Sequence, residues 1–192
     1  MTAAAAYVPP KPHLNQHGRK PAYQAVLAVD GRITDEHGTI YTDRAVKFCQ
    51  AGNLVCVFAG DSDAFTTAIR RLTDKPVRSA KAMARQLQVK GTDASGWTAL
   101  VYDIEAESLH TVDSDGTVLR EYKHAAAIGT GSEVAMGYLL AKNSEQVKPW
   151  GAGTAKNNVR GAIKAASERN NTVGPRCTVL TVGPTGKVSV KG

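Results

Sequence analysis

The sequence from residue 54 reads Leu54-Val55-Cys56-Val57-Phe58-Ala59-Gly60-Asp61-Ser62-Asp63-Ala64-Phe65. Its apolar first half predicts a short buried strand that stops at Gly60. The polar residues 61–63 can accept hydrogen bonds from the free N–H groups that begin a helix. Apolar residues then recur at helical spacing between Phe65 and Leu72. This stretch therefore predicts a buried strand that turns directly into an amphipathic helix.

The rest of the chain repeats this alternation of strands and helices. Short apolar or β-branched runs predict further strands at 22–29, 39–42, 97–102, 108–112, 117–119, 125–128, 177–182 and 187–190. Helical spacing predicts a second helix that Pro76 opens, and two more near 133–142 and 154–169. Strand runs separated by helix pairs predict a layered α+β domain, with two sheets and helices on the outside.

Length and composition exclude several classes of protein. The chain has 192 residues, of which 42% are hydrophobic, and this predicts one globular domain over residues 1–192. No apolar run is long enough to span a membrane, and the first residues lack the pattern of a secretory signal. Residues 9–21 are rich in proline and predict a loop inside the domain.

The cysteine and histidine residues predict neither a disulfide scaffold nor a metal site. Three cysteines form an odd set without a C-x-x-C pair, which favours a reducing compartment and a cytoplasmic location. The five histidines have no metal-ligand spacing, so no metal or cofactor is expected. The net charge is +7, but the basic residues are scattered without interleaved aromatic residues, which makes a nucleic-acid binder the weaker hypothesis.

Three blocks in order carry a family resemblance: residues 27–32 (Leu-Ala-Val-Asp-Gly-Arg), residues 54–65, and residues 126–132 (Ala-Ala-Ile-Gly-Thr-Gly-Ser). Together they resemble the proteasome family of N-terminal nucleophile hydrolases, and they are most similar to the bacterial HslV-type peptidase. The resemblance covers roughly residues 22–182. It implies a four-layer αββα sandwich, which sharpens the α+β prediction made from the pattern alone.

The resemblance also implies a reaction. In this family the side chain of the first residue of the mature chain attacks the substrate, and its own α-amine is the base. By position this residue is Thr2, which becomes N-terminal once Met1 is removed, and residues 2–8 would then form the first strand. The alternative is that Thr2 lies near a frayed terminus, because the four alanines after it are poor strand formers.

The resemblance further implies an aspartate and a lysine beside the nucleophile. Asp30 matches the aspartate, and Arg32 completes the Asp-x-Arg form of the family; the alternative is a turn residue. Counting along the hydrophobic pattern places Arg44 near the lysine position, whereas the nearest real lysine is Lys47. On a strand these two residues would face opposite sides, so both cannot point into the site. If Lys47 does not take the lysine position, it is a strand residue exposed to solvent.

Two further positions match the family. Gly60 would supply the backbone N–H that stabilises the oxyanion, and its alternative is a simple strand-to-helix turn. Thr130 stands where the family has a serine and would place a hydroxyl near the N-terminal amine. Its alternative is a helix cap. Ser132 is the second hydroxyl candidate and Asp63 could contact the substrate, but a helix cap is the favoured role for both.

These residues predict a threonine-type endopeptidase subunit of a self-compartmentalising ring. The implied partners are further copies of the same chain, polypeptide substrates and an ATPase unfoldase. The second hypothesis is a scaffold subunit with the same fold and no catalysis. It is motivated by the uncertain lysine position and by the long loop at residues 9–21.

Overall fold

The structure, a computed structural model, describes residues 2–10, 22–35, 37–88, 96–121, 124–144 and 150–192. These residues form helices and strands that alternate in groups along the chain. In chain order they are β1 (Ala3–Tyr7), β2 (Ala25–Asp30), β3 (Ile33–Thr34), β4 (Ile40–Thr42), β5 (Phe48–Ala51), β6 (Leu54–Gly60), α1 (Ser62–Asp74), α2 (Ala80–Leu87), β7 (Trp97–Asp103), β8 (Ser108–Asp113), β9 (Val118–Glu121), β10 (Ala125–Gly129), α3 (Ser132–Ser144), α4 (Ala152–Arg169), β11 (Cys177–Val182) and β12 (Val188–Lys191).

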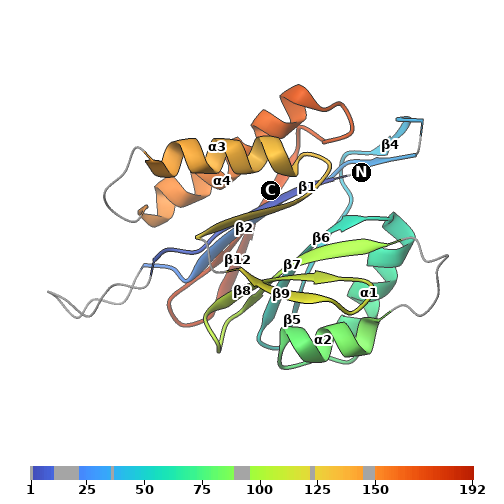
Figure 1. Cartoon of the computed structure of the whole chain (residues 1–192), viewed down its shortest axis with the longest axis vertical. Helices are drawn as coiled ribbons and strands as arrows, with labels where there is room; N and C mark the ends of the chain where they lie inside the picture. The colour runs from blue at the N-terminus through green and yellow to red at the C-terminus, as the bar shows by residue number, and fades with distance from the viewer. Residues whose placement is uncertain (1, 11–21, 36, 89–95, 122–123, 145–149) are drawn as a thin grey trace, which may run out of the picture.

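The strands form two five-stranded antiparallel sheets and a small hairpin. The first sheet has the order β10-β1-β2-β11-β12, and the second has the order β5-β6-β7-β8-β9. The hairpin of β3 and β4 follows β2 directly and projects from the body of the molecule (Figure 1). The first sheet thus brings together strands from distant parts of the chain, whereas the second follows the order of the sequence.

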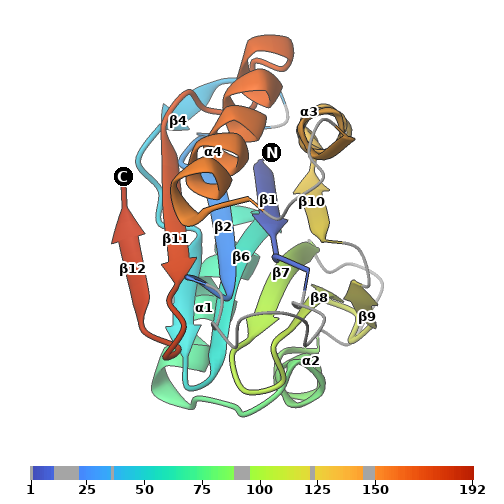
Figure 2. The same cartoon turned by 90° about the vertical axis from the view of Figure 1, so that its left-hand side faces the viewer.

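The two sheets lie face to face between two layers of helices. Helices α3 and α4 cover the outer face of the first sheet, and α1 and α2 cover the second (Figures 1 and 2). Three apolar clusters fill the spaces between these four layers, one under each helix pair and one between the sheets. The predicted α+β sandwich is therefore confirmed.

Strand β1 explains why an alanine run can form a central strand. It lies between β10 and β2, and residues Ala3–Ala6 have no exposed surface. Alternate alanines pack under the helices and against the second sheet, where larger side chains would push the layers apart. Close packing on both faces thus overrides the low strand propensity of alanine.

Other sequence predictions were wrong or fall outside the described residues. Helix α2 begins at Ala80 rather than at Pro76, because the Ser79 hydroxyl caps it by accepting a hydrogen bond from the Ala82 N–H. Strand β5 was not predicted, because it is only four residues long and contains the polar Gln50. Most of the predicted Pro-rich loop, at residues 11–21, lies outside the described residues.

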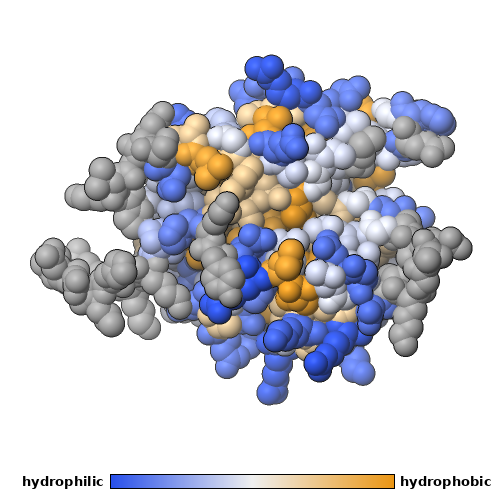
Figure 3. All heavy atoms as spheres, in the orientation of Figure 1, coloured by the Kyte–Doolittle hydropathy of each residue, from blue (hydrophilic) through white to orange (hydrophobic). Residues whose placement is uncertain are grey.

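The surface is hydrophilic over much of the face in Figure 3, while apolar atoms reach it in a band between the upper helices and the lower sheet. No helix in the described ranges has the length and apolar content needed to cross a membrane. Among the residues that the structure describes, six large apolar side chains are exposed, and they are Ile40, Tyr41, Val46, Leu119, Leu140 and Val190.

Candidate active site

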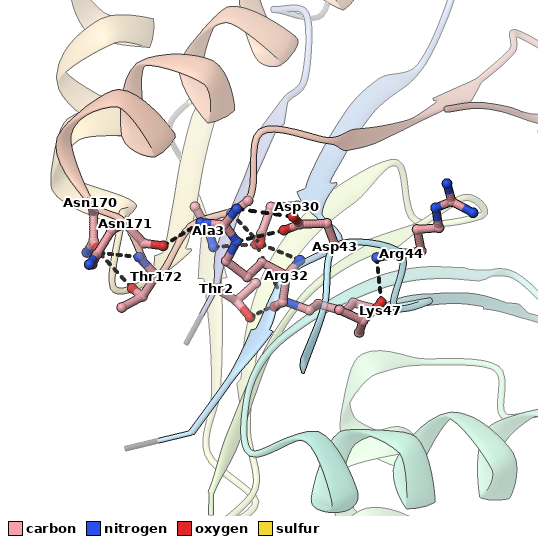
Figure 4. A network of polar contacts seen from close by, with 12 residues as sticks. Thr2, Ala3, Asp30, Arg32, Asp43, Arg44, Lys47, Asn170, Asn171 and Thr172 are labelled. Carbon is pink, nitrogen blue, oxygen red and sulfur yellow. Dashed lines mark hydrogen bonds and ion pairs between the residues drawn. The ribbon is translucent and has the colours of Figure 1, made fainter. Parts of the chain in front are cut away.

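Thr2 and Lys47 meet in the interior of the molecule, between the two sheets. Thr2 directly precedes β1 and is only 1% exposed, and Lys47 directly precedes β5 and is fully buried. The Lys47 ammonium donates a hydrogen bond to the Thr2 hydroxyl, with 2.6 Å between Nζ and Oγ1 (Figure 4). Because Thr2 Oγ1 accepts this bond, its own proton is free to be donated elsewhere.

Asp30 holds the backbone around this pair. It is the last residue of β2 and is fully buried. Its carboxylate accepts hydrogen bonds from the N–H groups of Ala3 (2.8 Å), Arg32 (2.9 Å) and Gly174 (3.0 Å), and Oδ1 lies 3.5 Å from Lys47 Nζ. One carboxylate thus fixes the start of β1, the turn after β2 and the loop before β11.

The buried ammonium of Lys47 is stabilised by nearby carboxylates and not by water. Burial lowers the pKa of its ammonium below the ordinary value, and the carboxylates of Asp30 and Asp43 oppose that shift. The ammonium also donates a hydrogen bond to the carbonyl of Arg32. These acceptors hold the ammonium in place, so that its positive charge lies next to the Thr2 side-chain oxygen.

The Arg32 side chain fixes the carbonyl that Lys47 contacts. Its guanidinium makes a two-pronged ion pair with Asp43, at 2.6 Å and 3.1 Å, and donates to the carbonyl of Asn171. The hydrogen bonds from Arg32 lower the pKa of the Asp43 carboxyl below its ordinary value. This clamp joins the turn after β2 to the segment after β4 and to the loop after α4 (Figure 4).

The opposite side of Thr2 faces the turn after β10. Gly129 has a φ of 85°, and a Cβ placed there would lie 2.0 Å from the Thr2 carbonyl oxygen, so only glycine fits. The Thr130 hydroxyl donates to that carbonyl at 3.4 Å and lies 3.4 Å from the hydroxyl of Thr172. Thr172 in turn donates to the Asn170 side chain at 2.6 Å. A chain of polar groups therefore runs from the loop after α4 to Thr2.

The structure places Lys47, and not Arg44, against Thr2. The Arg44 side chain is exposed and points away from the cluster, and its backbone N–H donates to the Thr42 hydroxyl (Figure 4). The count that placed Arg44 near the lysine position was therefore wrong, as was the alternative that Lys47 is a solvated strand residue. The count failed because the segment 43–47 between β4 and β5 is irregular, so strand periodicity does not apply to it.

Gly60 lies at the end of β6, where the chain turns toward α1. Its φ is 116°, and a Cβ would lie 2.4 Å from the carbonyl oxygen of Gly96, so the backbone requires glycine here. Gly60 and Thr2 line the same pocket, which has a volume of about 450 Å³. The remaining lining residues are Arg32, Ile33, Thr34, Asp35, Lys47, Asp61, Ser62, Phe65, Gly129 and Thr130.

Sequence reasoning missed several residues of this cluster. Asp43, Asn170, Thr172 and Gly174 lie in loops, and each resembles an ordinary turn or cap residue in the sequence. Their roles depend on contacts with residues far away in the chain, such as Asp30 with Gly174. The expectation that Asp63 caps α1 was wrong, because Asp61 is the cap and accepts hydrogen bonds from the N–H groups of Asp63 and Ala64. Ser132 is the first residue of α3.

Comparison with known families decides the relationship. The family model described as proteasome subunit matches residues 20–182, which is most of the chain. The chain belongs to the proteasome subunit family. The match covers Asp30, Lys47, Gly60 and Thr130, and it begins after β1 and Thr2. A comparison with curated proteins finds no match.

Proposed function

We propose that the chain is a threonine-type endopeptidase subunit of a ring-shaped compartmentalised protease. The observation that carries the proposal is the 2.6 Å contact between Lys47 Nζ and Thr2 Oγ1 inside a buried cluster. Burying a lysine ammonium costs free energy of folding unless the charge is paired and hydrogen-bonded. Here the ammonium lies against the Thr2 hydroxyl. Thr2 also lines a pocket of about 450 Å³, a volume within the usual range of ligand-binding pockets.

The proposed reaction begins once whatever precedes Thr2 has been removed. The freed α-amine, with a reference pKa near 8, takes the proton of the Thr2 hydroxyl. The Thr2 oxygen then bonds to the substrate carbonyl carbon, and the Lys47 ammonium stabilises the negative charge on the attacking oxygen. The scissile C–N bond breaks as the proton passes to the leaving amine, and water later hydrolyses the ester.

Three other residues have proposed roles in this reaction. The backbone N–H of Gly60 would stabilise the oxyanion, since the glycine leaves room for the substrate backbone. Asp30 would orient Lys47 and the start of β1, which its hydrogen bonds support. Thr130 would place a hydroxyl near the α-amine of Thr2, and its contact with the carbonyl of the same residue supports that role.

An intact-mass measurement tests whether the nucleophile is freed. The purified active protein is expected to lack Met1 and to begin at Thr2, because a peptide bond on the nitrogen of Thr2 would remove the base. A protein that keeps Met1 and still cleaves peptides would contradict the role of the amine. A protein that keeps Met1 and cleaves nothing would favour the catalytically inactive scaffold.

Assembly into a ring of identical subunits is part of the same proposal. Ile40 and Tyr41 are 49% and 69% exposed on the projecting β3–β4 hairpin, and Val46 nearby in sequence is 62% exposed. Apolar side chains of this size on a protruding element are typical of subunit contacts. Native mass spectrometry is expected to show a closed oligomer, and a monomer at micromolar concentration would contradict the ring. An ATPase partner, the HslV type and a cytoplasmic location stay predictions from the sequence.

A further inference from the structure

The pocket beside Thr2 has an uneven distribution of charge. Two cations and two carboxylates line it: Arg32, Lys47, Asp35 and Asp61. Both cations are already paired with carboxylates that do not line the pocket, Arg32 with Asp43 and Lys47 with Asp30. The positive charges in the lining are therefore balanced by carboxylates outside the pocket.

The two aspartates in the lining, in contrast, form no ion pair with a cation among the described residues. Asp35 Oδ1 accepts hydrogen bonds from the N–H groups of His37 (2.9 Å) and Thr39 (2.8 Å) in its own turn. Asp61 Oδ1 accepts from the N–H groups of Asp63 (3.0 Å) and Ala64 (2.8 Å) at the start of α1. The second oxygen of each carboxylate takes part in none of these contacts.

The start of α1 does not cancel this negative charge. A helix N-terminus is equivalent to about +0.5 of an elementary charge, against two full negative charges on Asp35 and Asp61. The hydrogen bonds from Thr39 and its turn lower the pKa of the Asp35 carboxyl below its ordinary value, so it is ionised at neutral pH. The pocket therefore keeps a negative potential.

The apolar part of the lining fits the stem of a long side chain. Phe65 is buried at 1% exposure and Ile33 is half-buried, and both line the pocket with the two carboxylates. Lysine and arginine side chains combine an aliphatic stem, which packs on such surfaces, with a cationic end. Acidic side chains would meet repulsion, and purely apolar ones would leave the carboxylates unpaired.

We propose that this pocket selects a lysine or arginine side chain of the substrate, from the residues just before the scissile bond. The inference rests on the proposed peptidase function and names its substrate class. Asp35 and Asp61 are the specificity-determining residues, and they belong to the segment after β3 and to the turn that begins α1.

Pairs of fluorogenic peptides test this selection. Each pair differs only in arginine against citrulline, a neutral side chain of nearly the same shape, at one of the three positions before the scissile bond. In at least one pair, kcat/KM is expected to be about tenfold higher for arginine, the effect of one or two charge pairs in a partly solvated pocket. The preference is expected to fall as salt rises.

Asparagine variants assign the preference to these residues. Asp35→Asn and Asp61→Asn are each expected to reduce the arginine-to-citrulline ratio severalfold, and the double variant to bring it near one. Asparagine still accepts the turn and cap hydrogen bonds, so the fold is kept. Asp63→Asn is the matched control, because Asp63 is an exposed acid of the same helix that does not line the pocket, and its ratio should stay unchanged.

The possible outcomes separate this inference from the proposed function. Equal rates for arginine and citrulline in every pair, or a preference that survives the double variant, would overturn the inference and leave the peptidase proposal standing. Cleavage of none of the peptides by a protein that begins at Thr2 would count against the peptidase proposal, and against this inference with it.

Discussion

Lys47→Met is expected to lower kcat/KM for a fluorogenic peptide by about 10²–10³-fold, the typical effect of removing one preorganised electrostatic group. The ammonium lies 2.6 Å from the Thr2 oxygen in a fully buried site, where charge interactions are stronger than in water. Methionine fills a similar volume but has no charge and no N–H to donate. The assay is steady-state hydrolysis at neutral pH.

Arg44→Met is the matched control for this prediction. Arg44 is a cation only three residues away, but its side chain is exposed and points away from Thr2. Its replacement should leave kcat/KM within about twofold, as for an ordinary surface site. Comparable losses in the two variants would show that the nearby positive charge, and not the Lys47 contact, matters for the reaction.

Unfolding experiments on Lys47→Met separate catalysis from folding. Burial lowers the pKa of Lys47, which means that the fold disfavours its charged form. Asp30 keeps three backbone N–H donors when the ammonium is gone, so its charge is not left without partners. The free energy of unfolding should therefore change by no more than about 1–2 kcal/mol.

Asp30→Ala is expected to have the largest effect on stability, a loss of about 3–5 kcal/mol in the free energy of unfolding. The substitution leaves the buried N–H groups of Ala3 and Gly174 without their acceptor, and it leaves the Lys47 ammonium without its carboxylate. Urea denaturation with circular dichroism measures the change.

Two further variants make the Asp30 prediction specific. Asp30→Asn keeps one carbonyl oxygen as an acceptor, so its loss should be smaller than that of alanine. Asp63→Ala removes an exposed acid of α1 and should cost less than about 0.5 kcal/mol. An Asp30→Ala protein as stable as Asp63→Ala would contradict the view that Asp30 joins β1, β2 and the loop before β11.

The layers of the fold were predictable because their signals are local. The buried strand and capped helix of residues 54–65 and the helical spacing in 154–169 are confirmed by β6, α1 and α4. Strand β1 was harder to predict, because alanine is favoured there only by close packing on both faces. That packing involves α4 and the second sheet, which the local sequence does not reveal.

The candidate site was predictable in its residue types and only partly in its geometry. Thr2, Asp30 and Lys47 were all candidates from the sequence, and the structure brings them together. The choice between Lys47 and Arg44 was not predictable, because it depends on how the irregular segment before β5 crosses the site. The contact between Asp30 and Gly174 spans 144 positions and leaves no local pattern.

Covalent labelling of Thr2 tests the proposed chemistry most directly. The purified protein is incubated with a peptide β-lactone, which acylates a reactive hydroxyl, and peptide mapping by mass spectrometry locates the adduct. Thr2→Ala and Lys47→Met are treated in parallel. One adduct per chain is expected on Thr2, absent from Thr2→Ala and strongly reduced in Lys47→Met. A protein that hydrolyses peptides but carries the adduct on another residue, or a Thr2→Ala protein that is still labelled and active, would contradict Thr2 as the nucleophile.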